Sequence, residues 1–78
     1  MGQHDKLIER IRSRPPVADF GDVRKLLEAY GWTLKRVKGS HSSFAKPGSG
    51  MLVISTVSGR KVKRYLLDQI CERLGLDG

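Results

Sequence analysis

Hydrophobic residues near the start of the 78-residue chain recur at helical spacing. Leu7, Ile8 and Ile11 lie on one helical face, so we predict a short lead-in helix over residues 5–14. Pro15 ends this helix, because proline has no amide hydrogen and restricts the residue before it. We expect this helix to pack loosely against the rest of the chain.

A second helix is predicted from a longer apolar stripe. The stripe has the spacing of a helix that buries one face against a core, and consists of Val23, Leu26, Leu27 and Tyr30. Asp19 is the expected N-cap, with Asp22 placing negative charge in the first turn. Gly31 is the expected end, because glycine readily adopts the left-handed backbone that closes helices.

From Trp32 onward the spacing of apolar residues changes to two. Strands are predicted over residues 32–38, 41–46 and 51–56, separated by a Gly-Ser turn and a Pro-Gly-Ser-Gly turn. The basic segment 57–63 is predicted to be an irregular connection. A last apolar stripe predicts the closing helix and consists of Leu67, Ile70, Cys71 and Leu74.

The order of these elements indicates one α+β domain. The economical packing is a three-stranded antiparallel sheet, connected as a meander, with the helices packed on one face. The other face of the sheet is then left open to water and ligands. A chain of 78 residues has room for a single domain.

His41 is predicted to lie on the open face of this sheet. Side chains alternate across a strand, and Phe44 should face the helices because it is the one large apolar residue of its strand. His41 has the opposite parity, and we expect Lys35 and Lys38 to lie close to it across the hairpin. The imidazole is then either a solvated strand residue or an acid/base group beside a bound phosphate.

The distribution of charge favours a polyanionic ligand. The formal net charge is +7, and residues 29–67 contain no carboxylate. This window holds eight bases, whereas the rest of the chain holds seven bases and eight acids. All the excess positive charge therefore lies in the central segment, which predicts a face that binds nucleic acid.

Other site chemistries and locations find little support in the sequence. His4, His41 and Cys71 lack the spacing of metal ligands, so we expect no metal and no cofactor. No acid is placed to orient His41 for nucleophilic catalysis by serine. No apolar run is long enough to cross a bilayer, and no signal peptide is recognisable. With a single cysteine, these features predict a cytoplasmic protein without a membrane partner.

Residues 20–76 also carry a set of motifs in a characteristic order. VRKLLEAYGW precedes a basic strand, GSHSSF follows at 39–44, and a PGSG turn, the strand MLVI and a helix ending in ERLGL complete the series. On these residues the chain resembles the HicA toxins of bacterial toxin–antitoxin pairs, also called the YcfA-like family.

The resemblance implies a fold like that of the double-stranded RNA-binding domain (dsRBD). Its α-β-β-β-α core would occupy residues 20–78, after an N-terminal helical extension over residues 1–19. The resemblance also implies an endonuclease that cleaves messenger RNA, with a HicB-type antitoxin as the partner that covers the active face. The histidine of the family's Gly-Ser-His motif carries over to His41 as the catalytic residue.

Two positions depart from the family's pattern. Members often have a second histidine directly after the first, where this chain has Ser42. Many members have Pro-His after the third strand, where this chain has Ser55 and Thr56. The second departure removes a possible helper group, so we expect weaker activity or a degenerate copy.

The predicted activity is metal-independent cleavage of mRNA, with His41 as acid or base and neighbouring cations around the phosphate. The predicted RNA-binding residues are Lys35, Arg36, Lys38, Ser40, Lys46, Arg60, Lys61 and Lys63. Two alternatives remain open at this point. One is a non-catalytic RNA-binding module of the same fold, and the other is a protein-interaction domain whose basic face meets an acidic partner.

Overall fold

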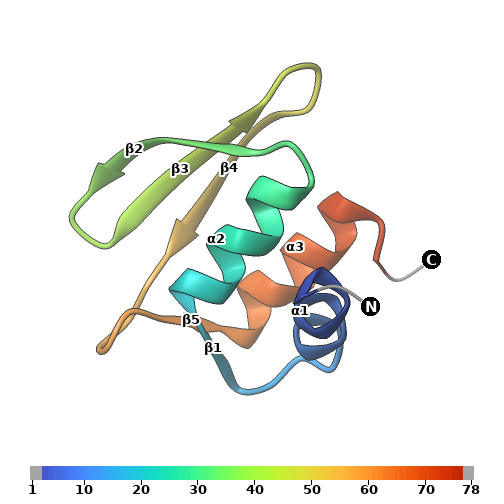
Figure 1. The fold of residues 1–78 in the computed structure, drawn as a ribbon. Coiled ribbons are helices and arrows are strands. Elements are labelled where there is room, and N and C mark those ends of the chain that lie inside the picture. The colour runs from blue at the N-terminus through green and yellow to red at the C-terminus, as the bar shows by residue number, and fades with distance from the viewer. Residues whose placement is uncertain (1–2, 77–78) are drawn as a thin grey trace.

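The computed structural model describes residues 3–76 (Figure 1). In chain order they form α1 (Gln3–Arg12), β1 (Val17–Asp19), α2 (Phe20–Ala29), β2 (Thr33–Lys38), β3 (His41–Lys46), β4 (Gly50–Ser55), β5 (Lys61–Lys63) and α3 (Arg64–Leu74). Strands β2, β3 and β4 form an antiparallel sheet in that order. The helices lie on one side of this sheet, which confirms the predicted α+β fold and its dsRBD-like order of elements.

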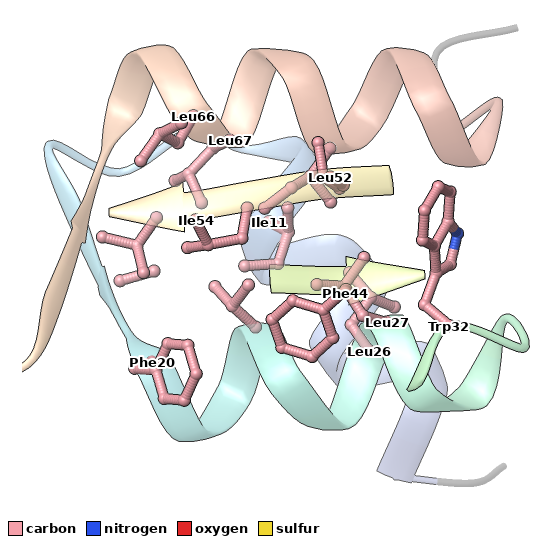
Figure 2. Close-up of a cluster of buried hydrophobic side chains, with 14 of the residues drawn as sticks. Ile11, Phe20, Leu26, Leu27, Trp32, Phe44, Leu52, Ile54, Leu66 and Leu67 are labelled. Carbon is pink, nitrogen blue, oxygen red and sulfur yellow. The ribbon is translucent and has the colours of Figure 1, made fainter. Parts of the chain in front are cut away.

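The core fills the space between the sheet and the helices (Figure 2). Phe44 of β3 is fully buried there, with its ring centroid 6.2 Å from that of Phe20 at the start of α2. The other large buried side chains come from every layer and include Leu26, Leu27, Trp32, Leu52, Ile54, Leu66, Leu67 and Ile70. The predicted stripes of α2 and α3 therefore face the same core as the inner face of the sheet.

Helix α2 begins and ends where the sequence predicts. Asp19 is its N-cap in extended backbone, although its side chain makes no capping hydrogen bond. Gly31 follows the helix with φ +91°, and a Cβ there would lie 3.4 Å from Cε of Lys46. The positive φ favours glycine at this position, whereas the Lys46 side chain would only be in ordinary contact with a Cβ.

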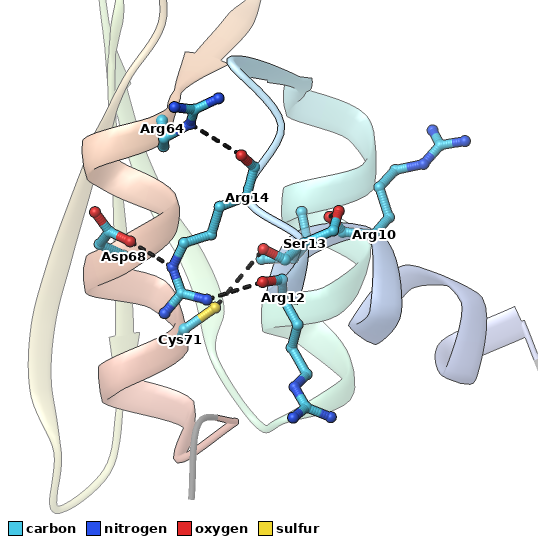
Figure 3. Close-up of polar contacts among 8 residues, drawn as sticks. Arg10, Arg12, Ser13, Arg14, Arg64, Asp68 and Cys71 are labelled. Atoms are coloured by element: carbon cyan, nitrogen blue, oxygen red, sulfur yellow. Dashed lines mark hydrogen bonds and ion pairs between the residues drawn. The ribbon is translucent and has the colours of Figure 1, made fainter.

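The lead-in helix α1 is packed more tightly than we expected. Ile11 is fully buried, and the thiol of Cys71 on α3 contacts its carbonyl oxygen at 3.8 Å. Beyond the helix, Arg14 forms an ion pair with Asp68 of α3 (Figure 3). The expectation of loose packing was wrong, because Ile11 is fully buried and Ile8 packs against the same core. The boundary between residues 19 and 20 stays a prediction.

A two-stranded sheet joins the N-terminal segment to the segment before α3. Strand β1 pairs antiparallel with β5, with Ala18 opposite Val62 and Asp19 opposite Lys61. Residues 61–63 were predicted to be irregular, and this prediction was wrong. A three-residue strand is too short to show alternation, and its partner lies far back in the chain.

An ion pair between Asp19 of β1 and Lys61 of β5 links the two strands at one end of this sheet. The hydrogen bond from the Lys61 ammonium group, and then its positive charge, lower the pKa of Asp19 below its usual value. Asp19 is therefore harder to protonate in the folded chain than in the unfolded chain.

We expect the stability that this ion pair contributes to be lost in acid. The unfolded chain binds the proton at higher pH than the folded chain, so stability rises with pH in the interval between the two pKa values. The contribution is complete above about pH 5 and disappears as the pH falls through the lowered pKa of Asp19. The difference in melting temperature between wild type and Asp19→Asn should narrow as the pH falls from about 6 to about 2. Lys61→Gln should behave in the same way. A difference in melting temperature that does not change with pH would contradict this assignment.

Candidate functional site

His41 is the first residue of the central strand β3 and lies on the open face of the sheet. Its Cα pairs with that of Lys38 on β2 and with that of Ser55 on β4. Opposite residues of antiparallel strands project to the same face, with their Cβ atoms about 5 Å apart. Lys38, His41 and Ser55 therefore form a row across the sheet, on the side away from the helices.

The burial of β3 confirms the predicted strand parity. Phe44 and Ser42 are 0% and 5% exposed, whereas His41 is exposed and Ser43 is half-buried. The imidazole of His41 is thus outside the core. Its place on the open face is confirmed, and its catalytic role stays a prediction.

A β-bulge in β2 changes which side chains share this face. Leu34 pairs with Phe44, but the next paired residue of β2 is Arg36, which lies opposite Ser43. Lys35 is the extra residue of the bulge, so two residues of β2 oppose one residue of β3. The register beyond the bulge is shifted by one residue.

Two cations lie on the side of His41 by ordinary strand alternation. Arg36 and Lys38 differ by two in number, and Lys38 pairs with His41, so both lie on the face of His41. The bulge affects Leu34 and Lys35: Leu34 takes the inward parity of Phe44, and Lys35 is the extra residue beside Arg36. We call the surface formed by Lys35, Arg36, Lys38, His41, Ser43 and Ser55 the His41 face.

The start of β3 is fixed by a tight turn. Gly39 has φ +59° and Ser40 does not have a positive φ, a pattern typical of a two-residue type II′ hairpin turn. The backbone nitrogen of Thr56 donates a hydrogen bond of 2.9 Å to the carbonyl oxygen of Ser40. The predicted binding residue Ser40 thus lies in the turn beside His41, held by the segment that follows β4.

The two departures from the family's pattern have different structural meanings. Ser42 is buried beneath the sheet, so a histidine at this position would not lie beside His41. Ser55 lies directly opposite His41, and the Thr56 hydroxyl is 3.4 Å from the carbonyl oxygen of Ser40. The Ser55–Thr56 position is therefore the one that adjoins the imidazole. Ser55 was not among the predicted site residues, because only the pairing register places it there.

Lys46 is not brought together with His41. It is the last residue of β3, has the parity of Phe44, and its side chain extends over Gly31. The length of a six-residue strand is about 17 Å, and the two side chains project to opposite faces. Lys46 is thus outside the His41 face.

The remaining predicted binding residues form a second basic segment. Arg60 lies over the ring of Phe20, with its guanidinium carbon 5.0 Å from the ring centroid. Lys61 forms its ion pair with Asp19, and Lys63 is exposed at the end of β5. This segment follows β4 in the chain, so it begins at the end of the sheet where Ser55 adjoins His41.

Two properties of the described residues bear on the kind of site. Among residues 5–76, no three His, Cys, Asp or Glu side chains are grouped so that they could hold a metal ion. Over the same residues, no helix has both the length and the apolar composition needed to span a bilayer. The His41 face is therefore a basic surface with one imidazole and several hydroxyl groups.

The chain was compared with known protein families, curated proteins and solved structures. A family model described as the HicA toxin of bacterial toxin-antitoxin matches residues 20–76. No curated protein and no solved structure gives a significant match. The family match covers α2, the three-stranded sheet, β5 and α3, and so includes the whole His41 face.

Proposed function

This chain belongs to the HicA toxin family of bacterial toxin–antitoxin systems, and we propose on that premise that it is an endoribonuclease acting at the His41 face. The observation that carries the proposal is the row of Lys38, His41 and Ser55 across the open side of the sheet. It supplies an imidazole, a group able to accept or donate a proton, beside a cation on a surface that an RNA backbone can reach. The proposed substrate is messenger RNA.

His41 serves in this proposal as the base that starts the reaction. It removes the proton from a ribose 2′-hydroxyl, and the 2′-oxygen attacks the adjacent phosphorus. The bond from phosphorus to the 5′-oxygen breaks, which leaves a 2′,3′-cyclic phosphate and a 5′-hydroxyl. The departing 5′-oxygen takes its proton from water or from the ammonium group of Lys38. No water nucleophile and no metal ion is needed for this step, because RNA carries its own nucleophile.

The cations of the His41 face have a separate role. Negative charge grows on the phosphoryl oxygens during the attack, and fixed positive groups nearby stabilise it. Lys38 lies opposite His41, Arg36 lies two residues along the same face, and Lys35 is the extra residue of the bulge beside Arg36. With a single histidine on the face, the second proton transfer lacks a dedicated acid, so we expect slow turnover.

The proposal also includes the partner and the location of the protein. A HicB-type antitoxin would cover the His41 face and block access of RNA to it. An acidic surface on that partner would complement Arg36 and Lys38, which are exposed. We propose a cytoplasmic location, where messenger RNA and the antitoxin are both present.

Incubation of the pure protein with RNA in the presence of EDTA tests the activity. Cleavage at discrete sites, with 2′,3′-cyclic phosphate ends, is the expected result. Retention of intact RNA would instead favour a non-catalytic RNA-binding module of the same fold. A protein that binds no RNA even at low salt would favour a protein-interaction domain, because binding to phosphate strengthens as salt falls.

We expect the double substitution Lys35→Gln and Lys38→Gln to weaken RNA binding across all sequences, because lysine–phosphate interactions position the RNA without reading its bases. The slope of log affinity against log salt should fall by about 0.7 for each phosphate that the variant no longer neutralises. Fluorescence anisotropy over a salt series measures both effects. Lys25→Gln, on the exposed side of α2, is the matched control and should leave both unchanged. Unchanged RNA binding by the double variant would show that the RNA does not bind at Lys35 and Lys38.

A further inference from the structure

A surface depression lies outside the His41 face, between the two-stranded sheet and the first turn of α3. It has a volume of about 530 Å³ and is lined by Pro16, Val17, Lys63, Arg64 and Tyr65. Tyr65 is 55% exposed and Val17 is 43% exposed. The exposed ring of Tyr65 thus lies with an exposed valine in one depression, where its surface is open to a ligand.

The wall of this depression is held in place by backbone contacts. Val17 pairs with Lys63 across the two strands, which sets their side chains on one side of the sheet. The backbone nitrogen of Arg64 donates to the carbonyl oxygen of Pro16 at 3.2 Å. The Arg64 side chain donates from Nε to the carbonyl oxygen of Arg14 at 2.9 Å (Figure 3). The site is therefore already formed in the folded chain.

The charged residues that line the depression are all positive. Asp68, three residues after Tyr65 on α3, pairs with Arg14, and Asp19 of β1 pairs with Lys61. Among residues 3–76, neither Lys63 nor Arg64 forms an ion pair with a carboxylate. An exposed aromatic ring flanked by unneutralised cations is the arrangement that proteins use to bind unpaired nucleotides.

We propose that this depression binds an unpaired nucleotide of the RNA substrate. The base stacks on the ring of Tyr65, and Lys63 and Arg64 contact the flanking phosphates. This inference rests on the proposed function, since it takes RNA as the ligand, and it adds a second binding position apart from the one where cleavage occurs. In the chain, residues 56–64 connect Ser55, opposite His41, to Tyr65 at the depression.

RNA binding by variants in the His41→Ala background tests this site without cleavage. The probe is a short unstructured RNA oligonucleotide, measured by fluorescence anisotropy at fixed salt. Tyr65→Ala should weaken binding by about 5- to 100-fold, whereas Tyr65→Phe should bind as the parent does because the ring is kept. In a salt series, Lys63→Gln should reduce the salt slope by about 0.7, and Lys25→Gln should not change it. Circular dichroism should show that Tyr65→Ala is folded, since the ring is exposed.

A cleavage assay with otherwise wild-type protein separates this inference from the proposed function. Tyr65→Ala should slow cleavage of a long RNA but leave cleavage of a dinucleotide unchanged, because a dinucleotide occupies only the His41 face. If RNA is cleaved and Tyr65→Ala binds and cleaves long RNA as wild type does, the inference is overturned and the proposed function stands. The inference would also be overturned if Tyr65→Ala lost antitoxin binding but kept its affinity for RNA. Wild-type protein that binds no RNA would overturn both.

Discussion

Replacing His41 with alanine should abolish RNA cleavage and leave the protein folded and able to bind RNA. Removal of a general base lowers a rate by about 100- to 10,000-fold, and a slow enzyme then falls below detection. His41 is exposed on the sheet, so its removal costs no core packing. Binding should persist because Arg36 and Lys38 remain. Single-turnover cleavage, anisotropy and thermal melting measure the three properties on the same preparation.

The control for this variant is Ser43→Ala, which removes a hydroxyl group from the same strand and face. It should cleave RNA at a rate close to that of wild type. If His41→Ala also cleaves at the wild-type rate, His41 is a solvated strand residue. Catalysis would then need another base, and the hydroxyl groups of Ser43 and Ser55 do not titrate near neutral pH. The protein would in that case be an RNA-binding domain.

Replacing Phe44 with alanine should destabilise the fold by about 3–5 kcal/mol. Phe44 is fully buried between the sheet and the helices, and its ring packs near that of Phe20. A domain of this size buries a smaller share of its surface than a large domain does, so the loss is a large part of a stability of about 5 kcal/mol. Urea denaturation followed by circular dichroism should show a much lower midpoint, with partial unfolding already in water.

Val53→Ala is the matched control for this core substitution. Val53 lies on the neighbouring strand β4 but projects to the open face and is 44% exposed. Its replacement should cost less than about 1 kcal/mol. A Phe44→Ala protein that unfolds at the wild-type midpoint would contradict the inward position of Phe44, and with it the outward position of His41.

The three-stranded sheet could be predicted from the sequence because each of its strands is delimited by turn residues. Gly39 and Ser40 separate two segments of period-two pattern, and the observed strands begin and end within one residue of the predicted ones. Phe44 then fixes which face is buried, since strand alternation leaves no choice once one large apolar residue is placed. The outward position of His41 followed from that single residue.

The rest of the site depends on contacts that a periodic pattern does not contain. The bulge at Lys35 lies between Leu34 and Val37, whose spacing of three departs from the period-two pattern without showing which residue is the extra one. Ser55 enters the site only through the pairing of β4 with β3. Strand β5 is three residues long, and its partner β1 lies outside the stretch covered by the family's motifs.

The pairing of β1 with β5 determines the order in which the chain can complete its fold. The β2-β3-β4 meander joins segments that are close in sequence, so it can form early at little entropic cost. Val17 acquires its strand partner only when Lys63 is in place, much later in the chain. During synthesis, which adds about 5–20 residues per second, β1 is made before the meander and β5 after it. The nascent chain therefore holds the edge of β1 unpaired until β5 has emerged.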